Sequence, residues 1–421
     1  MGLSFTVRFW PCISYKTKDQ FHIEMNSQNY EHSTKKIVLV QTATNVNMIL
    51  NFGRNLTELI KQSDIEYHVI YSKNQNKSNE SVIAGELENL NATLHTVPLK
   101  QELSLKSLFG LFSSFLRIFL LLRKIKPDVL HTRGTLMGII GRAAAFFARV
   151  DRVFHHQDDF YHREDTLSPA RKRIFKTLEK LLAKTTTKLL FVSETIKEEA
   201  IEIGIPEHKC INVGHDLHPI FIQHLSSEVR RSDLINKYMG SNSEKFIVGT
   251  LSRIEEFKGI DTIVAVAKKV QQQQADIKFF VRGTGSKFEK YQRIIQEEAL
   301  SDTIFLTKDY LPTEEIPPLF KSFDVFFLPT RREGFGMVFA EAMSMGIPVV
   351  CPKIYPVVEV VPNDMGCLIE AEDVEGYTNA ILSLYHDEQK RSMLASKARE
   401  YAIDRWGGKK SAQLVLDTLI H

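Results

Sequence analysis

Residues 324–341 read DVFFLPTRREGFGMVFAE, and this stretch decides the fold. Its first six residues are mostly apolar, which is typical of a strand buried on both faces of a sheet. Gly334 and Gly336 then predict a tight turn, and the residues after them predict a helix. A strand, a glycine turn and a helix in that order leave free backbone N–H groups at the positive end of a helix dipole. This arrangement suits a phosphate group.

Two carboxylates bracket the predicted turn. Glu333 and Glu341 are eight positions apart, which is about 12 Å along a helix and nearly one face of it if both residues are helical. Carboxylates suit hydroxyl groups, so we expect one to bind a sugar and the other a ribose.

Two further segments repeat the strand-then-loop pattern. Residues 246–261 predict a strand, a loop that carries Arg253 and Lys258, and a helix. Arginine offers a planar fork to phosphate oxygens, and lysine adds a mobile point charge. Residues 277–285 predict the next strand, which ends in a Gly-x-Gly turn.

Taken in this order, the three segments resemble the motifs of family 4 glycosyltransferases, which are retaining, use nucleotide sugars and have the GT-B fold. The resemblance runs from about residue 36 to the C-terminus and is strongest in residues 246–375. It implies an α/β protein with two Rossmann-like parallel-sheet domains facing across a cleft, and a C-terminal helix that crosses back to the first domain. The expected boundaries are 1–34 for an N-terminal extension, 35–217 for the acceptor domain, 218–400 for the donor domain and 401–421 for the crossover helix.

The resemblance also implies roles for individual residues. Arg253 and Lys258 would hold the donor diphosphate, Glu333 would bind donor hydroxyls, and Glu341 would bind the ribose diol. The remaining donor-binding residues would be Gly283, Gly285, Phe335, Gly336, Met337 and Val338. Catalysis would rest on Glu333, Arg253, Lys258 and a first-domain histidine.

The acceptor side departs from the family pattern. The family has a glycine-rich loop after its first strand, whereas residues 41–47 of this chain contain no glycine. Acceptor contacts are expected from Asn45, Gln157 and Asp158. One register places Gln157 where the family has its histidine, and a slip of one residue places His156 there. We favour His156 because an imidazole can do acid–base chemistry, and both registers stay open.

No Asp-x-Asp occurs in the chain, so the sequence predicts no metal site and a metal-independent reaction. The two cationic residues and the helix N-terminus would stabilise the leaving diphosphate instead. No cofactor is expected beyond the UDP- or GDP-linked sugar, which is a substrate. The four cysteines have no spacing typical of zinc sites or of a disulfide framework.

The excess of positive over negative charge lies in the first half of the chain. Residues 35–215 carry 26 Lys and Arg against 19 Asp and Glu, whereas residues 216–421 carry 25 against 29. Basic residues flank the apolar run 108–122, which Arg117 interrupts and which is short for a membrane span. The segment from Lys106 to Lys126 is therefore either a basic amphipathic helix on an anionic membrane or a core helix with a solvated edge.

The function that follows is sugar transfer to a hydroxyl in cell-surface polysaccharide or glycolipid synthesis. The expected partners are a nucleotide sugar, an acceptor glycan or lipid-linked sugar and an anionic membrane surface, with no nucleic acid. The alternatives are a GT-B-shaped nucleotide-sugar epimerase, a phosphorylase-like enzyme and a catalytically inactive sugar-binding subunit. We see no secretory signal and expect a cytoplasmic protein, peripheral on the inner face of the plasma membrane. Residues 1–34 match nothing, and we expect either that they are a disordered arm or that translation starts at Met25.

Overall fold

The computed structural model describes residues 37–43, 49, 53–72, 91–98, 105–164, 167–227, 235, 237–240, 245–273, 275–309 and 311–421. Side chains of residues 105–109 are not included in that description. Residues 36–421 form one compact unit, and the expected N-terminal extension, residues 1–34, lies outside the described residues.

Seven parallel strands form the first sheet, in the order β3-β2-β1-β4-β5-β6-β7. The strands are β1 (Ile37–Ala43), β2 (Ile65–Ser72), β3 (Thr93–Val97), β4 (Val129–Arg133), β5 (Arg152–Gln157), β6 (Lys188–Phe191) and β7 (Cys210–Asn212). The helices of this part are α2 (Arg54–Lys61), α4 (Leu105–Ile125), α5 (Thr135–Ala148), α6 (Pro169–Thr185) and α7 (Glu194–Glu202). The short helix α8 (Pro219–Gln223) comes next and packs through Phe221 into a core of the second sheet.

Six parallel strands form the second sheet, in the order β10-β9-β8-β11-β12-β13. These are β8 (Phe246–Leu251), β9 (Ile277–Arg282), β10 (Ile304–Thr307), β11 (Val325–Phe327), β12 (Val349–Pro352) and β13 (Cys367–Ile369). The helices are α10 (Ile260–Gln272), α11 (Phe288–Glu297), α12 (Ile316–Lys321), α13 (Met337–Ser344), α14 (Val357–Val360), α15 (Val374–His386), α16 (Glu388–Trp406) and α17 (Lys410–Ile420). Two all-parallel sheets separated in sequence confirm the predicted doubled α/β fold.

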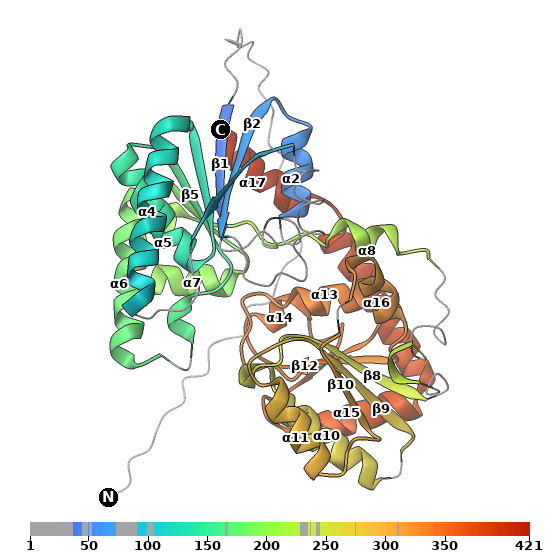
Figure 1. Ribbon diagram of the computed structural model, residues 1–421. Helices are drawn as coiled ribbons and strands as arrows, with labels where there is room; N and C mark the ends of the chain where they lie inside the picture. Colours follow the sequence, from blue (N-terminus) through green and yellow to red (C-terminus); the bar gives the residue numbers. More distant parts are fainter. Residues whose placement is uncertain are drawn as a thin grey trace, which may run out of the picture. The chain divides into compact units, whose positions relative to one another are not determined.

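Alternating side chains of each strand enter two separate cores, one on each face of the sheet. In β1, Leu39 packs with α2 and α17, whereas Val40 packs with α4 and α5. Figure 1 shows these two helix pairs on opposite sides of the first sheet. Burial on both faces explains why the strands lack the apolar–polar alternation of a half-exposed sheet.

The C-terminal helix crosses back as predicted. α16 packs into a core of the second sheet through Ala398, Ala402 and Trp406, whereas α17 joins the α2 side of the first. The carboxylate of Asp216 accepts hydrogen bonds from the backbone N–H groups of Ser411 and Ala412, at 2.9 and 2.8 Å. A carboxylate at this end of α17 also complements the helix dipole.

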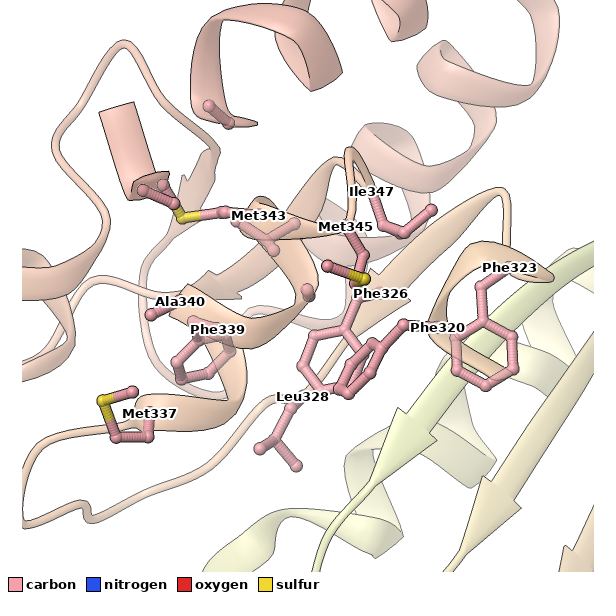
Figure 2. Close-up of a cluster of buried hydrophobic side chains, with 14 of the residues drawn as sticks. Phe320, Phe323, Phe326, Leu328, Met337, Phe339, Ala340, Met343, Met345 and Ile347 are labelled. Carbon is pink, nitrogen blue, oxygen red and sulfur yellow. The ribbon is translucent and has the colours of Figure 1, made fainter. Parts of the chain in front are cut away.

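The segment that decided the fold forms β11, a loop and α13. Phe326 and Leu328 pack with Phe339 of α13 in the cluster of Figure 2, so the strand and the helix are fixed against each other. Gly336 precedes the helix with φ of 98°, a left-handed conformation that favours glycine. Glu341 is helical, but Glu333 lies in the loop before the helix, so the condition that both glutamates are helical is not met.

Candidate functional site

A pocket of about 770 Å³ opens at the carboxyl ends of strands in both sheets. Ligands of open parallel sheets bind at this edge, because loops from several strands meet there. The wall includes Arg253, Lys258 and Gly283 from the second sheet, together with Glu333 and residues 335–338. Glu341 and Asp158 also line it.

Three of the predicted site residues lie elsewhere. Gly285, His156 and Gln157 are not part of the pocket wall. Asn45 lies outside the described residues. The structure thus brings most of the donor-side residues together, while the roles of the acceptor-side residues stay predictions.

Lys258 and Glu333 form the central ion pair of the pocket, with Nζ and Oε1 2.5 Å apart. Each side chain is only 11% exposed. Lys258 ends the 3₁₀ turn η4 (Glu256–Lys258), and Gly259 follows with φ of 71°. A side chain at Gly259 would collide with the backbone oxygen of Pro329, so glycine allows the turn to lie against the loop after β11.

Three cationic side chains lie close to the ring of Phe257. The guanidinium carbons of Arg253 and Arg332 lie 5.1 and 4.7 Å from the ring centroid, and the Lys258 nitrogen lies 5.4 Å away. Cations over an aromatic face are attracted by its quadrupole. The ring therefore helps to hold like charges together on one side of the pocket, where an anion would bind.

Among the residues that the structure describes, no cation is paired with Glu341 as Lys258 is paired with Glu333. Burial raises the pKa of its carboxyl to about 7. A carboxylate in this position gains from any hydroxyl donor that a ligand supplies, because hydrogen bonds favour its charged form.

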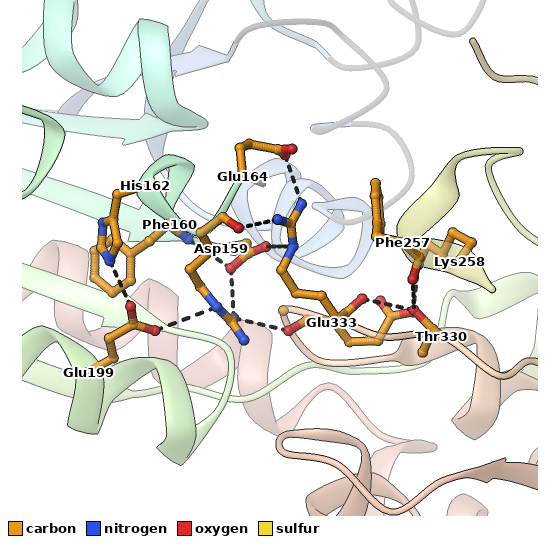
Figure 3. A network of polar contacts seen from close by, with 12 residues as sticks. Asp159, Phe160, His162, Glu164, Glu199, Phe257, Lys258, Thr330 and Glu333 are labelled. Carbon is orange, nitrogen blue, oxygen red and sulfur yellow. Dashed lines mark hydrogen bonds and ion pairs between the residues drawn. The ribbon is translucent and has the colours of Figure 1, made fainter. Parts of the chain in front are cut away.

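A polar network joins the Glu333 loop to the loop after β5, as Figure 3 shows. Arg163 donates to the backbone oxygen of Glu333 at 3.1 Å and to Asp159 at 2.8 Å. Arg332 donates to Glu164 at 2.9 Å and to the backbone oxygen of Arg163. The loop that carries Glu333 is therefore held by residues from the first half of the chain.

The neighbouring carboxyl groups of Asp159 and Asp158 have pKa values that are shifted in opposite directions. Burial raises the pKa of Asp159, and Arg163 and Arg332 only partly offset this effect. At Asp158, burial also raises the pKa, but the Arg133 guanidinium outweighs it and leaves the pKa below its ordinary value. Arg133 ends β4 and donates to both oxygens of Asp158, at 3.0 and 2.6 Å.

His156 and Gln157, the two residues between which the sequence left the choice open, are both buried in β5. His156 is 4% exposed, and neither of its ring nitrogens has a hydrogen-bond partner among the described residues. Burial holds its pKa well below the ordinary value, with Arg133 adding to the effect. The side chain of Gln157 bonds to His155 at 2.7 Å and to the backbone oxygen of Asp159.

Several residues of the pocket wall were missed by the sequence reasoning, namely Arg332, Asp159, Phe257 and His215. Arg163, which bonds to the Glu333 loop without lining the pocket, was missed as well. Asp159 and Arg332 each neighbour a residue that was predicted, and their charge was the available signal. Arg163 reaches Glu333, and His215 approaches Asp158 and Phe335, across long separations in the chain.

No group of three or more His, Cys, Asp or Glu side chains that could hold a metal ion occurs among the described residues. The described helices include none that is both long and apolar enough to cross a membrane.

Family models match both halves of the chain. The model of glycosyl transferases group 1 matches residues 232–401, and that of glycosyltransferase family 4 matches residues 50–213. Both describe glycosyl transfer, so the epimerase alternative receives no support.

Curated relatives extend over most of the chain. The capsular polysaccharide biosynthesis glycosyltransferase CapM of Staphylococcus aureus is 25% identical over 87% of this chain and 91% of its own length. A UDP-Gal:α-D-GlcNAc-diphosphoundecaprenol α-1,3-galactosyltransferase of Escherichia coli is 27% identical over 75% of this chain and 80% of its own.

Solved structures share the fold at lower identity. Anabaena HepE in complex with UDP and glucose has a TM-score of 0.75 at 17% identity, covering 91% of this chain and 99% of that one. WaaG, a glycosyltransferase involved in lipopolysaccharide biosynthesis, has a TM-score of 0.70 at 13% identity, with 91% and 100% covered. With the motifs, the fold and the family models in agreement, the chain belongs to the family 4 glycosyltransferases and is a nucleotide-sugar-dependent enzyme of the GT-B fold.

Proposed function

We propose that this enzyme transfers a sugar, with retention of anomeric configuration, from a UDP- or GDP-linked donor to a hydroxyl of a glycan or lipid-linked sugar. The observation that carries the proposal is the buried pair of Lys258 and Glu333, which lies beside Arg253 and the glycine turn before α13. One wall of the pocket thus offers cations for a diphosphate and carboxylates for hydroxyls.

Each donor residue has a role that follows from its chemistry. Arg253 and Lys258 bind the diphosphate, with backbone N–H groups of residues 335–338 at the start of α13. Glu333 accepts hydrogen bonds from donor sugar hydroxyls, and Glu341 accepts them from the ribose diol. Since Lys258 already contacts Glu333, one lysine would link sugar recognition to phosphate recognition.

In the proposed reaction the bond between the anomeric carbon and the phosphate oxygen breaks, and its electron pair stays on the phosphate. The acceptor oxygen then bonds to the anomeric carbon on the same face, and its proton passes to the leaving phosphate. Arg253 and Lys258 stabilise the charge that develops on that phosphate, which is usually the largest catalytic contribution. No divalent metal is required in this scheme.

The acceptor class is inferred from the relatives and from the surface. The Escherichia coli relative is named for a diphosphoundecaprenol-linked acceptor, and the Staphylococcus aureus relative for capsular polysaccharide. From these names we infer that the acceptor of this enzyme is a lipid-linked sugar in cell-surface polysaccharide or glycolipid synthesis. The enzyme would be peripheral on the inner face of the plasma membrane.

A continuous surface of α4, α5 and α6 supports the membrane part of the proposal. α5 packs against both neighbours, and Phe115 of α4 meets Phe147 of α5 edge to face at 5.8 Å between ring centroids. Large apolar side chains are exposed on all three helices, with Phe112 at 63% and Phe146 at 58%. Their exposed large apolar residues are Phe112, Leu116, Leu120, Phe146, Phe147, Ile174 and Leu181.

The same surface is basic. Exposed Arg and Lys side chains lie on α4 and along α6. The three helices contain one acidic residue, Glu179, which is buried and paired with Arg142 at 2.7 Å. An apolar surface with basic residues around it gains both burial and about 1 kcal/mol per well-placed cation at an anionic membrane.

A panel of nucleotide sugars tests the donor part. A donor that binds the folded state raises its apparent stability, so the cognate UDP- or GDP-sugar should raise Tm. It should then yield product with a lipid-linked acceptor. Failure of every UDP- and GDP-sugar to bind, with the protein folded, contradicts the proposed donor class.

A further inference from the structure

Asp158, Asp159 and Glu164 are the carboxylates of the first half of the chain in the pocket wall. Asp158 lies next to the two positions, 156 and 157, where the sequence offered a histidine. Asp158 directly follows β5 and lines the pocket wall, with its side chain 31% exposed. His156 is buried two residues earlier and is not part of that wall. The residue that faces a ligand here is therefore acidic.

Asp158 also lies against the loop that carries Glu333. A side chain at Gly334 would collide with the backbone oxygen of Asp158. Ser193 donates to the backbone oxygen of Gly334 at 3.0 Å and fixes the same approach. Since Gly334 is adjacent to Glu333, a sugar bound by Glu333 would lie near Asp158.

The ion pair of Asp158 has a definite orientation. Arg133 is 2% exposed and lies on the protein side, whereas the carboxylate is partly open to the pocket. Two hydrogen bonds fix the carboxylate plane. The carboxylate is therefore the more exposed end of the pair at the pocket wall, and it keeps its charge near neutral pH because the Asp158 pKa is lowered.

His215 completes this wall. Its Nε2 lies 4.0 Å from Asp158, and its ring lies 5.5 Å from that of Phe335. Burial, helped by Arg133, lowers the pKa of His215 to about 4, so the ring is neutral at pH 7. It does not cancel the negative charge that Asp158 presents.

We propose that Asp158 is the catalytic carboxylate facing the anomeric carbon of the donor sugar, where it stabilises positive charge, and that Arg133 is its positioning residue. This inference rests on the proposed function. As the bond from the anomeric carbon to phosphate breaks, positive charge spreads over that carbon and the ring oxygen. Asp158 stays ionised throughout and forms no bond, because the acceptor oxygen takes the carbon and the phosphate takes the acceptor proton.

The test is a kinetic comparison of Asp158→Asn with the parent, and Asp404→Asn serves as the matched control on an exposed residue outside the pocket. Asp158→Asn should lower kcat by roughly 10²- to 10³-fold and leave the donor KM within about threefold, since the amide keeps the shape and removes the charge. An unchanged Tm increase with UDP would show that the fold and the donor site are intact. A kcat within threefold of the parent overturns the proposal.

Two further measurements separate the proposed role from others. Arg133→Lys, which keeps the charge and loses the bidentate fork, should lower kcat and leave the donor KM unchanged, whereas a general loss of structure would also reduce the UDP-induced increase in Tm. Mass spectrometry after incubation with donor alone should find no glycosyl unit on the protein. A sugar attached to Asp158 would make it a nucleophile and overturn the electrostatic role. Absence of transfer by the parent would instead contradict the proposed function.

Discussion

Glu341 gives the most quantitative prediction, since burial raises its pKa to about 7 in the free protein. If the ribose diol donates hydrogen bonds to this carboxylate, the bound complex favours the charged form and the pKa returns toward its ordinary value of 4.5. Donor binding then releases a proton at neutral pH. Affinity should therefore be full above pH 7 and fall as the pH drops below it.

The magnitude follows from these two pKa values. Between pH 8 and pH 5.5 the ionised fraction of free Glu341 falls to about 3%, while the bound form stays mostly ionised, so Kd should rise about 30-fold. Isothermal titration calorimetry with the intact nucleotide sugar measures this directly. Its two phosphates are esterified at both ends and keep their charge over this range, unlike the terminal phosphate of free UDP.

Glu341→Gln is the control, because the amide keeps the size of the side chain and cannot titrate. Its Kd should be weaker than that of the parent at pH 8 and nearly independent of pH. His215, with a pKa of about 4, stays neutral over the whole window. A parent enzyme whose donor affinity is equally strong at both pH values would refute the assignment of Glu341 to the ribose.

Three other predictions address the phosphate cations, the metal and the membrane. Arg253→Ala and Lys258→Ala should each lower kcat by about 10²-fold or more, because a buried diphosphate loses a charge-assisted partner; parent-like turnover in a rate assay would remove both residues from the site. Turnover should survive EDTA, and complete loss that manganese or magnesium restores would contradict the metal-free scheme. The protein should sediment with phosphatidylglycerol vesicles at low salt and less at high salt. Removing the charges of Lys106, Arg117, Arg123, Lys124 and Lys126, or replacing Phe112 and Phe146 by Ser, should reduce sedimentation. Met393→Ser, at an exposed position of α16, should not. Equal sedimentation of all variants would leave the alternative of a core helix with a solvated edge.

The donor half of the site could be predicted because its chemistry is local in sequence. The strand, the glycine turn and the helix of residues 324–341 form one continuous unit, and the same holds for Arg253 and Lys258 after β8. Gly336 and Gly259 have left-handed backbone conformations, which explains why glycines marked these turns. The order of such units predicted both sheets.

The acceptor half could not be predicted to the same depth, because its geometry depends on distant residues. The side chains that hold Asp158 and Glu333 come from Arg133 and Arg163, which are 25 and 170 positions away. A strand-end register also cannot be read to one residue from sequence alone. Of the neighbouring residues that the sequence offered here, Asp158 is in the pocket wall, whereas His156 and Gln157 are not.

The anomeric configuration of the product tests the central claim most directly. A donor whose sugar is α-linked to the diphosphate is incubated with enzyme and a lipid-linked or soluble acceptor, and proton NMR reads the coupling constant of the new linkage. Retention at the site formed by Arg253, Lys258 and Glu333 predicts an α-linked product with one nucleoside diphosphate released per linkage. A β-linked product would contradict the proposed retention, and no nucleotide release with any donor would contradict glycosyl transfer itself.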